Sequence, residues 1–433
     1  MPARPRFLLR LPLLCAAGAV FFSAAVAPEA SAQEATPAPR PWESDAFRPV
    51  TEARIAALPA ADQAAWRAYL SASASLARPP SKPTDRVENT AQLLVNSAPI
   101  PAVYSTRLQL NAAPAWYASA EARSIAGHIV AWQRPSGGWT KGGVYTRAPQ
   151  AADDHHDGWS AGTFDNDSTI YELRFLALVI HAGPNDPAAA AWRGSFARGL
   201  AYIFAAQYPN GGWPQIYPLA GGYHDAITFN DDAMVHILEL LADTADRRKE
   251  FAFVPADLAA EAATRLARGI QCVLATQLKD AAGRPTVWGQ QHDALTLQPC
   301  AARNFEPISE CSLESAGLVQ FLMSIPRPSP EIMAAVEGAM AWFPAHALRG
   351  VTWDRDATSG RGLVERAGAP DLWARYYEIG TGRPVFGERD RSVHYAVTEL
   401  TTERRKGYGW YNSRAATLPA AYAKWKAGLA GKP

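Results

Sequence analysis

AWQRPSGGWTKG at residues 131–142 and AAQYPNGGWPQI at residues 205–216 are two copies of one motif. A fainter copy, ATQLKDAAGRPTVWGQQ, follows at residues 275–291. The glutamines of the three copies are 74 and 70 residues apart, and their tryptophans are 74 and 75 residues apart (Gln133, Gln207 and Gln277; Trp139, Trp213 and Trp288). Periods of this length are typical of a stacked or circular array of similar structural units.

Each unit is predicted to be a helical hairpin. Before the glutamines, apolar residues recur at helical intervals, as in Phe196, Leu200 and Ile203. After each tryptophan, a polar loop leads into a second helical stretch, at residues 163–179, 228–241 and 309–322. Alternation of period two, which is typical of strands, is rare. Three or more hairpins around an axis predict an all-α fold, an (α/α)3 barrel or toroid whose mouth is formed by the loops.

The first 32 residues are predicted to be a secretory signal peptide. They have a basic start, an apolar run from Leu11 to Val26, and the small-x-small site Ala30-Ser31-Ala32. The apolar run is too short and too rich in alanine for a membrane span. We therefore expect a secreted or periplasmic protein with no membrane attachment after the signal is removed.

The remaining chain is predicted to have two parts. Residues 33–86 form a Pro-rich linker with a short helical piece at residues 51–76, and residues 87–428 form the main domain. Lys and Arg number 42 against 41 for Asp and Glu, which argues against nucleic acid as the main partner. No feature of the sequence demands more than a monomer.

Three cysteines follow the signal, an odd number for an oxidising compartment. Cys300 and Cys311 are close enough in sequence to form a disulfide, which would close the loop that carries Arg303. Cys272 lies in an apolar helical stretch and is expected to be inert core.

Two of the predicted second helices open with acidic and amide residues. These clusters are Asp165-Asn166-Asp167 and Asn230-Asp231-Asp232. One such residue per helix would suffice to cap the free backbone N–H groups. Three in a row, at equivalent places in neighbouring units, indicate surplus oxygen ligands at one end of the array. Such oxygens suit Ca²⁺, and helix capping alone is the alternative.

A second group of candidates is cationic. The segment WARYYEIGTGRPVFGERD at residues 373–390 places three arginines among aromatics. Planar guanidinium groups suit a substrate that carries many carboxylates, although a solvated basic surface is an alternative. Lys141 and Arg303 would add positive charge at the same rim. Trp139 and Trp213 could either wedge between hairpins or stack on a pyranose ring.

Several of these motifs together resemble the family 10 pectate lyases. They are GGWTKG, TFDNDSTIYELRFLALV, QYPNGGWPQIYPLAGGYHDAITFNDDAM, VWGQQHDALTLQPCAARNFEP, WARYYEIGTGRPVFGERD and ERRKGYGWY, and the likeness runs from about Ala91 to Trp425. The resemblance implies an (α/α)3 barrel and a requirement for Ca²⁺. It also implies cleavage of de-esterified homogalacturonan, the main chain of pectin, by β-elimination to 4,5-unsaturated oligogalacturonides.

The resemblance also assigns roles to residues of this chain. Arg389 would be the base that removes the proton from C5, with Glu388 in place of the family's usual glycine. The residues expected to bind substrate are Arg303, Arg375, Lys141 and Asp165, and those expected to hold the metal are Asp165, Asn166 and Asp231. An unperturbed arginine has a pKa above ~12, so burial among cations and alkaline operation would be expected.

Two other functions are consistent with the same residues. A glycoside hydrolase on an α/α toroid would use Asp165 and Asp231 as acid and base. A non-catalytic polyuronate-binding protein would use the tryptophan loops and arginines alone. A terpenoid-cyclase-like toroid would want an acidic, aromatic-lined cavity instead of arginines.

Overall fold

The computed structural model describes residues 40–41, 48–76, 108–150, 162–354 and 362–430. The chain divides into two units, Met1–Ala38 and Pro39–Pro433, and every described residue belongs to the second. The predicted signal peptide therefore lies outside the described residues. None of the helices in the described ranges combines the length and apolarity needed to cross a bilayer.

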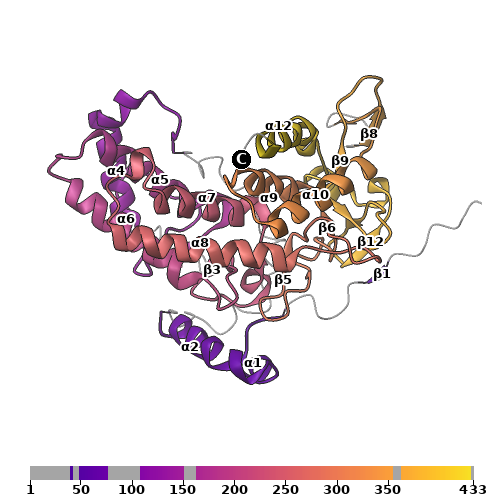
Figure 1. The fold of residues 1–433 in the computed structure, drawn as a ribbon, viewed down its shortest axis with the longest axis horizontal. Helices are drawn as coiled ribbons and strands as arrows, with labels where there is room; N and C mark the ends of the chain where they lie inside the picture. Colours follow the sequence, from indigo (N-terminus) through magenta and orange to yellow (C-terminus); the bar gives the residue numbers. More distant parts are fainter. Residues whose placement is uncertain (1–39, 42–47, 77–107, 151–161, 355–361, 431–433) are drawn as a thin grey trace, which may run out of the picture. The chain divides into compact units, whose positions relative to one another are not determined.

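Helices dominate the described part of the chain (Figure 1). The longer ones are α2 (Ala60–Leu76), α4 (Ala120–Trp132), α5 (Ile170–Ala182), α6 (Ala189–Ala206), α7 (Ala233–Ala245), α8 (Ala256–Thr276), α9 (Ser312–Ser324), α10 (Pro330–Ala345) and α12 (Leu418–Ala430). Two shorter helices are α1 (Glu52–Ala56) and α11 (Thr402–Lys406). The predicted all-α class is confirmed.

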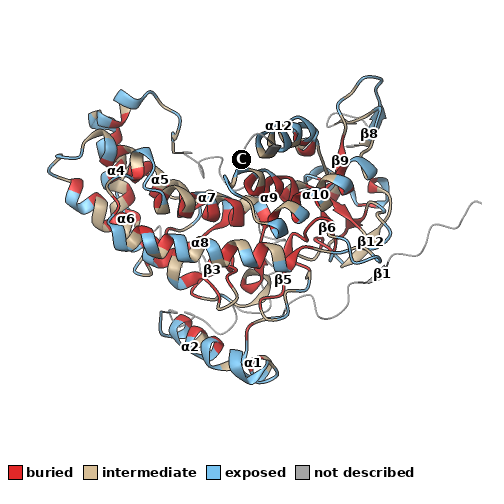
Figure 2. Cartoon of the chain, in the orientation of Figure 1, coloured by how far each residue is buried: buried red, intermediate tan, exposed pale blue. Residues whose placement is uncertain are grey.

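The helices pack as successive hairpins. Helix α5 packs against α4 and α6, α7 against α8, and α9 against α10. The second helices of the hairpins also contact one another in order, α5 with α7 and α7 with α9, and α12 packs against α9. The faces between neighbouring helices are buried, and the outer faces are exposed (Figure 2). This arrangement brings the loops before α5, α7 and α9 to one end of the array.

Short antiparallel strands join each hairpin to the next. Strand β2 (Gly162–Thr163) pairs with β3 (Ile216–Tyr217), β4 (Ile227–Thr228) with β5 (Gln291–His292), and β6 (Glu310–Cys311) with β10 (Tyr376–Tyr377). In each pair, one strand leads into the second helix of a hairpin, and its partner follows the tryptophan of the next unit. The remaining strands are β9 (Trp373–Ala374) with β13 (Tyr411–Asn412), β7 (Val351–Asp354) with β8 (Gly362–Glu365), and β12 (Ser392–His394) between β1 (Arg40–Pro41) and β11 (Phe386–Gly387).

The repeated glutamines connect neighbouring hairpins. Each lies at the C-cap of its helix and donates from Nε2 to a carbonyl of the next first helix. Gln133 reaches Ser195 O at 2.9 Å, Gln207 reaches Arg265 O at 2.9 Å, and Gln277 reaches Ala335 O at 2.9 Å. The glutamine spacing therefore reflects one hydrogen bond made three times.

The repeated tryptophans are structural. Trp139, Trp213 and Trp288 are fully buried, and each indole N–H donates to a carbonyl of the helix before it, at 2.7–2.8 Å. Trp373 makes the same bond to Phe343 O at 2.8 Å, which reveals a fourth unit that begins with α10. Because these rings have no exposed face, the interpretation of Trp139 and Trp213 as sugar platforms is wrong.

Helical glycines make room for these tryptophans. A Cβ added at Gly269 in α8 would lie 2.6 Å from Leu238 and 2.8 Å from Trp213. We expect Gly269→Ala to lower the free energy of unfolding by about 1–3 kcal/mol, because a packed core resists added volume. Gly127→Ala in α4 is the control, since its Cβ would meet nothing within 4 Å and should add about 0.5–1 kcal/mol. Urea unfolding of both variants measures the difference, and equal shifts would contradict this packing account.

The cysteines are free. Cys272, Cys300 and Cys311 make no disulfide with one another, and Cys272 is buried in α8 as expected. Cys311 lies in β6, where its thiol donates to Glu314 Oε2 at 2.5 Å. A bond between Cys300 and Cys311, which their spacing allowed, is therefore not formed in this structure.

Candidate active site

The two acidic clusters occupy matching short helices, η4 (Asp165–Asp167) before α5 and η6 (Asn230–Asp232) before α7. The first member of each is buried, with Asp165 5% and Asn230 6% exposed. The second members, Asn166 and Asp231, have left-handed backbones with φ of 48° and 51° and are exposed. The clusters are thus one motif built twice, which presents its middle residue outward.

Helix capping does not account for these side chains. The N-cap positions of α5 and α7, Thr169 and Asp232, make no side-chain capping hydrogen bond. The third members are paired instead, Asp167 with His236 Nδ1 at 2.6 Å and Asp232 with Arg414 at 2.5 Å. Asn230 is held by hydrogen bonds to Gln290, Arg375 and Asp231, so Asp165, Asn166 and Asp231 are the cluster residues left for a ligand.

The charge of Asp165 acts on the carboxyl group of Asp231, and the short helices that carry the two residues are in contact. Lys141 Nζ lies 2.6 Å from Asp165 Oδ2, so the two form an ion pair. Burial raises the pKa of Asp231, the charge of Arg375 opposes that shift, and the charge of Asp165 adds to it. The two carboxylates thus face a common region, in which a bound cation would relieve their repulsion.

Arg375 is a buried cation between this region and the core. Its side chain is 7% exposed, and its guanidinium forms an ion pair with Glu314 and donates to Asn230 Oδ1 at 3.1 Å. Burial alone would lower its pKa, but the charge of Glu314 raises the pKa well above its ordinary value. Arg375 therefore stays protonated and is fixed in direction.

Arg303 is held by Glu306 in a bidentate ion pair. Arg303 Nε donates to Glu306 Oε2 at 2.9 Å, and NH2 donates to Oε1 at 2.5 Å. Burial would raise the pKa of Glu306, but the hydrogen bonds from Arg303 hold it at about 2. Tyr408 also donates to Glu306 at 2.7 Å, and the Arg303 guanidinium carbon lies 5.1 Å from the Phe305 ring centroid.

Arg389 is half-buried, with 33% of its side chain exposed, and forms an ion pair with Glu403. Its Nε and NH2 donate to Glu403 at 2.8 Å each, and these hydrogen bonds raise its pKa. Glu388 holds the local backbone, because its two oxygens accept from Arg389 N and Thr401 N at 2.8 Å. Glu388, which stands where the resemblance implies a glycine, therefore has a structural role.

The predicted residues lie in one electrostatic neighbourhood. The carboxyl group of Asp231 is influenced by Arg375, Asp165 and Arg303, and the imidazole of His224 by Asp165, Arg303 and Lys141. Arg303 in turn acts on Arg389. The charge of Arg303 therefore acts both on the acidic clusters and on Arg389.

Sequence reasoning missed several residues of this site. Arg404 is 4% exposed, and its guanidinium carbon lies 4.0 Å from the Phe305 ring centroid. The positive charges of Arg389 and Arg303 both act to lower its pKa. The charges of Asp165 and Arg303 also influence the pKa values of Tyr223 and His224. The only signal in the sequence was that Arg404 falls in ERRKGYGWY and the other two in GGYHDAITF.

The site has donors that protein groups leave free. Among the described residues, Arg375 Nε, Arg389 NH1 and Arg404 Nε are buried and have no hydrogen-bond partner. Unpaired guanidinium donors are costly when buried, so three of them around one region favour an anionic ligand there.

The same region has the donor set for a hard cation. Asp165, Asn166 and Asp231 offer two carboxylates and an amide, the oxygen donors that Ca²⁺ accepts with flexible geometry. Within the described ranges, no three His, Cys, Asp or Glu side chains converge on one point. A calcium ion here would therefore take further oxygens from solvent or ligand, and the residues fit such an open site.

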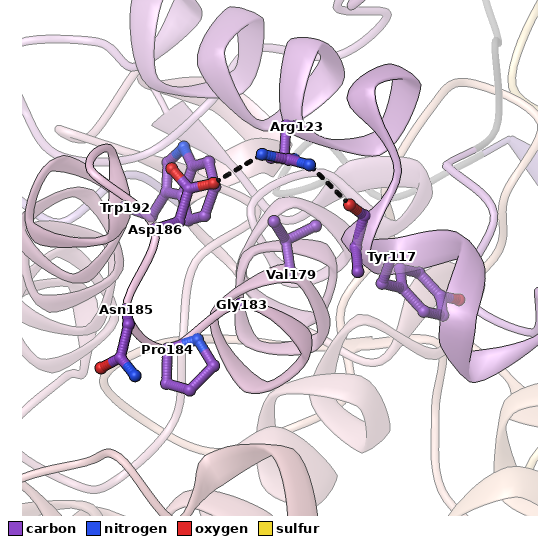
Figure 3. A pocket seen from close by; sticks show the side chains of 9 residues that line it. Tyr117, Arg123, Val179, Gly183, Pro184, Asn185, Asp186 and Trp192 are labelled. Carbon is purple, nitrogen blue, oxygen red and sulfur yellow. Dashed lines mark hydrogen bonds and ion pairs between the residues drawn. The ribbon is translucent and has the colours of Figure 1, made fainter.

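A separate pocket lies at the other ends of α4 and α5 (Figure 3). It is lined by residues that include Tyr117, Arg123, Asp186 and Trp192. Arg123 donates to Asp186 Oδ2 at 3.1 Å and to Ala118 O at 3.0 Å, so its charge is already paired. A helix of 13 residues spans about 20 Å, which separates this pocket from the acidic clusters.

Comparison with known proteins identifies the family of the chain. The sequence profile of the pectic acid lyase family matches residues 133–418. The solved family 10 polysaccharide lyase from Cellvibrio cellulosa is 32% identical, with a TM-score of 0.63, over 74% of this chain and 98% of that one. A mutant of that enzyme in complex with trigalacturonic acid is also 32% identical, with a TM-score of 0.63, over 72% and 95%. No curated protein matches the chain.

The fold and the site thus define a polysaccharide lyase. Within that class, the chain belongs to the pectic acid lyase family and is a pectate lyase of polysaccharide lyase family 10. The sequence left two other functions open, a glycoside hydrolase that uses Asp165 and Asp231 and a binding protein without catalysis. Membership of a lyase family excludes both.

Proposed function

We propose that this enzyme cleaves de-esterified homogalacturonan by calcium-assisted β-elimination and releases 4,5-unsaturated oligogalacturonides. The observation that carries the proposal is the gathering of Asp165 and Asp231 with Arg303 and Arg375 in one charged region. The buried, unpaired guanidinium donors beside it suit the uronate carboxylates of such a polymer. The Cellvibrio cellulosa enzyme bound to trigalacturonic acid supports the same substrate class.

The metal is proposed to be Ca²⁺, held by Asp165, Asn166 and Asp231. When bound, it would supply positive charge beside the uronate carboxylate as the C5 proton leaves. Lys141, paired with Asp165 at 2.6 Å, would then be released to bind substrate. Arg375 stays fixed by Glu314 and Asn230 and would hold the sugar carboxylate in one orientation.

The base is proposed to be an arginine, and two arginines are candidates. The family resemblance assigns the role to Arg389. The charge distribution favours Arg303, because C5 is bonded to the uronate carboxylate carbon and the base must lie near the group that binds that carboxylate. Arg303 acts electrostatically on Asp231, whereas Arg389 is not among the charges that influence Asp231 most.

Either arginine has to lose its carboxylate partner before it can accept a proton. Glu306 holds Arg303, and Glu403 holds Arg389. Both ion pairs favour the protonated guanidinium, so in the ligand-free state neither group is a base. We propose that the entering substrate and its cation displace one pair, and that alkaline pH favours the deprotonated form. The other arginine would bind a neighbouring uronate.

The reaction is tested by ultraviolet absorbance of the unsaturated product. The mature protein is incubated with polygalacturonate at alkaline pH, with and without a calcium chelator. A rise in absorbance that the chelator abolishes and added Ca²⁺ restores is the expected result. New reducing ends without a rise in absorbance would identify hydrolysis, and a chelator-resistant rise would exclude the role proposed for calcium.

Export and assembly are also part of the proposal. The basic and apolar start of the chain supports secretion to the periplasm or the medium, where an acidic plant polymer would be met. The protein is proposed to act as a monomer on oligogalacturonides and pectin, without nucleic acid or membrane partners.

A further inference from the structure

Residues 48–76, called here the strap, lie outside the region that matches the pectic acid lyase family, which spans residues 133–418. They contain α1 and α2, where the sequence predicted a short helical piece within a linker. Ile55, Trp66 and Tyr69 are buried and belong to the same hydrophobic core as the catalytic hairpins. The strap is therefore a packed part of the structure, and its contacts show what it holds.

Helix α2 contacts the loop that follows α6. Tyr69 donates from its hydroxyl to Ala206 O at 3.0 Å, and its ring centroid lies 5.8 Å from that of Tyr217. Ser73, which is 2% exposed, accepts from Leu219 N at 2.8 Å. The same loop continues to Tyr223 and His224, whose pKa values respond to Asp165 and Arg303.

Helix α1 contacts a second loop. Arg54 NH2 donates to both oxygens of Asp293, at 2.8 and 2.7 Å, and the side chain of Asp293 is 3% exposed. Arg54 NH1 also donates to Pro49 O at 3.0 Å, which fixes the guanidinium in the strap. Asp293 organises its own loop by accepting from Leu295 N and Thr296 N at 3.0 and 2.8 Å.

The second loop leads directly to Arg303. Cys300 N donates to Gln291 O at 3.0 Å, so the segment before Arg303 is tied to β5. Asn210 Nδ2 donates to Ala294 O at 2.7 Å, which joins the two loops to each other. The strap thus contacts both segments that supply Arg303, Tyr223 and His224.

We propose that the strap positions the substrate site, and that Arg54 is its main positioning residue. The expected effect on KM rests on the proposed function, whereas the expected effect on the order of the loops does not. Loops that are ordered before binding spare the substrate the cost of ordering them. Removal of Arg54 leaves the buried Asp293 carboxylate without its cation, which loosens the loop before Arg303.

The test compares Arg54→Ala with the wild type in the full chain. We expect KM for polygalacturonate to rise about 10-fold with a smaller change in kcat, because binding then has to order the loops. Amide hydrogen exchange should accelerate in residues 217–225 and 291–303 and stay unchanged in α7. Arg54→Lys, which keeps the charge, should restore part of the affinity. Arg67→Ala is the control, since Arg67 pairs with the exposed Glu52 at 2.7 Å on the strap itself.

The result that would overturn the proposal is a lower Tm for Arg54→Ala with KM and loop exchange equal to those of the wild type. That outcome would make the strap purely structural. If the wild type has no lyase activity, the proposed function fails, while the exchange measurement still decides the strap. If Arg54→Ala does not fold, Ser73→Ala removes one hydrogen bond to Leu219 N and should loosen residues 217–225 alone.

Discussion

Arg303→Ala is expected to lower kcat on polygalacturonate by about 10³-fold, the scale of a lost general base. Arg303 acts electrostatically on Asp231, next to the proposed position of the metal-bound carboxylate. Arg389→Ala should raise KM with a smaller loss of kcat, because its guanidinium is paired with Glu403 and the main charges that act on it are Glu403, Glu388 and Arg303, with neither Asp165 nor Asp231 among them. Steady-state kinetics at saturating Ca²⁺ separates the two effects.

Arg383→Ala is the matched control for this pair. It removes an arginine from the same segment, but that guanidinium stacks on Tyr395 with 3.9 Å between its carbon and the ring centroid. We expect kcat and KM to stay at wild-type values. If Arg389→Ala loses kcat and Arg303→Ala keeps it, the base is Arg389, as the family resemblance implies.

Asp231→Ala is expected to weaken the apparent affinity for Ca²⁺ by at least about 10-fold, with activity partly recovered at high Ca²⁺. Asp231 is one of the two carboxylates in the proposed metal site, and its side chain is 39% exposed. Asp371→Ala removes an equally exposed carboxylate outside the site, 40% exposed, and should leave the calcium dependence unchanged. Titration of lyase activity with Ca²⁺ measures both variants.

The pH dependence of the calcium requirement has a defined sign. The pKa of Asp231 is raised, so protons compete with the cation for this carboxylate at higher pH than for an ordinary aspartate. The wild type should therefore need more Ca²⁺ as the pH falls, and Asp231→Ala should lose that part of the dependence. An identical pH dependence in the two proteins would exclude Asp231 as a ligand.

The repeat in the sequence predicted the fold because its residues make local and repeated contacts. Each glutamine ends a helix, and each tryptophan bonds to the helix just before it, so a fixed spacing records them. The fourth unit escaped prediction because His346 takes the place of glutamine at the end of α10 and Trp373 follows only after the β7–β8 hairpin. The burial of the tryptophans depends on glycines in neighbouring helices, such as Gly269, which no single motif reveals.

The site was predicted less completely, for a physical reason. Asp165, Asp231, Arg303 and Arg375 stand out as charged groups in motifs, and the structure brings them together. The ion-pair partners of Arg375 and Arg389 are ordinary glutamates. Glu314 is 61 residues from Arg375, and Glu403 is 14 residues from Arg389. Partners at such separations are set by tertiary packing, so the pKa shifts they cause could not be foreseen.

The strap shows the same limit. The sequence predicted a short helical piece at residues 51–76, but not that Tyr69 and Ser73 would contact the end of α6 and the loop after it. The Arg54–Asp293 pair joins residues 239 apart. Only the folded chain shows that a segment outside the family match contacts the loops of the site.

The most direct test of the central claim is a crystal structure of the Arg303→Ala variant soaked with trigalacturonate and Ca²⁺. We predict one ligand whose carboxylates contact Arg375 and a calcium ion bound by Asp165 and Asp231, with a sugar C5 beside the space that Arg303 leaves. A ligand bound elsewhere, such as the pocket lined by Arg123 and Asp186, with no metal between Asp165 and Asp231, would contradict the account.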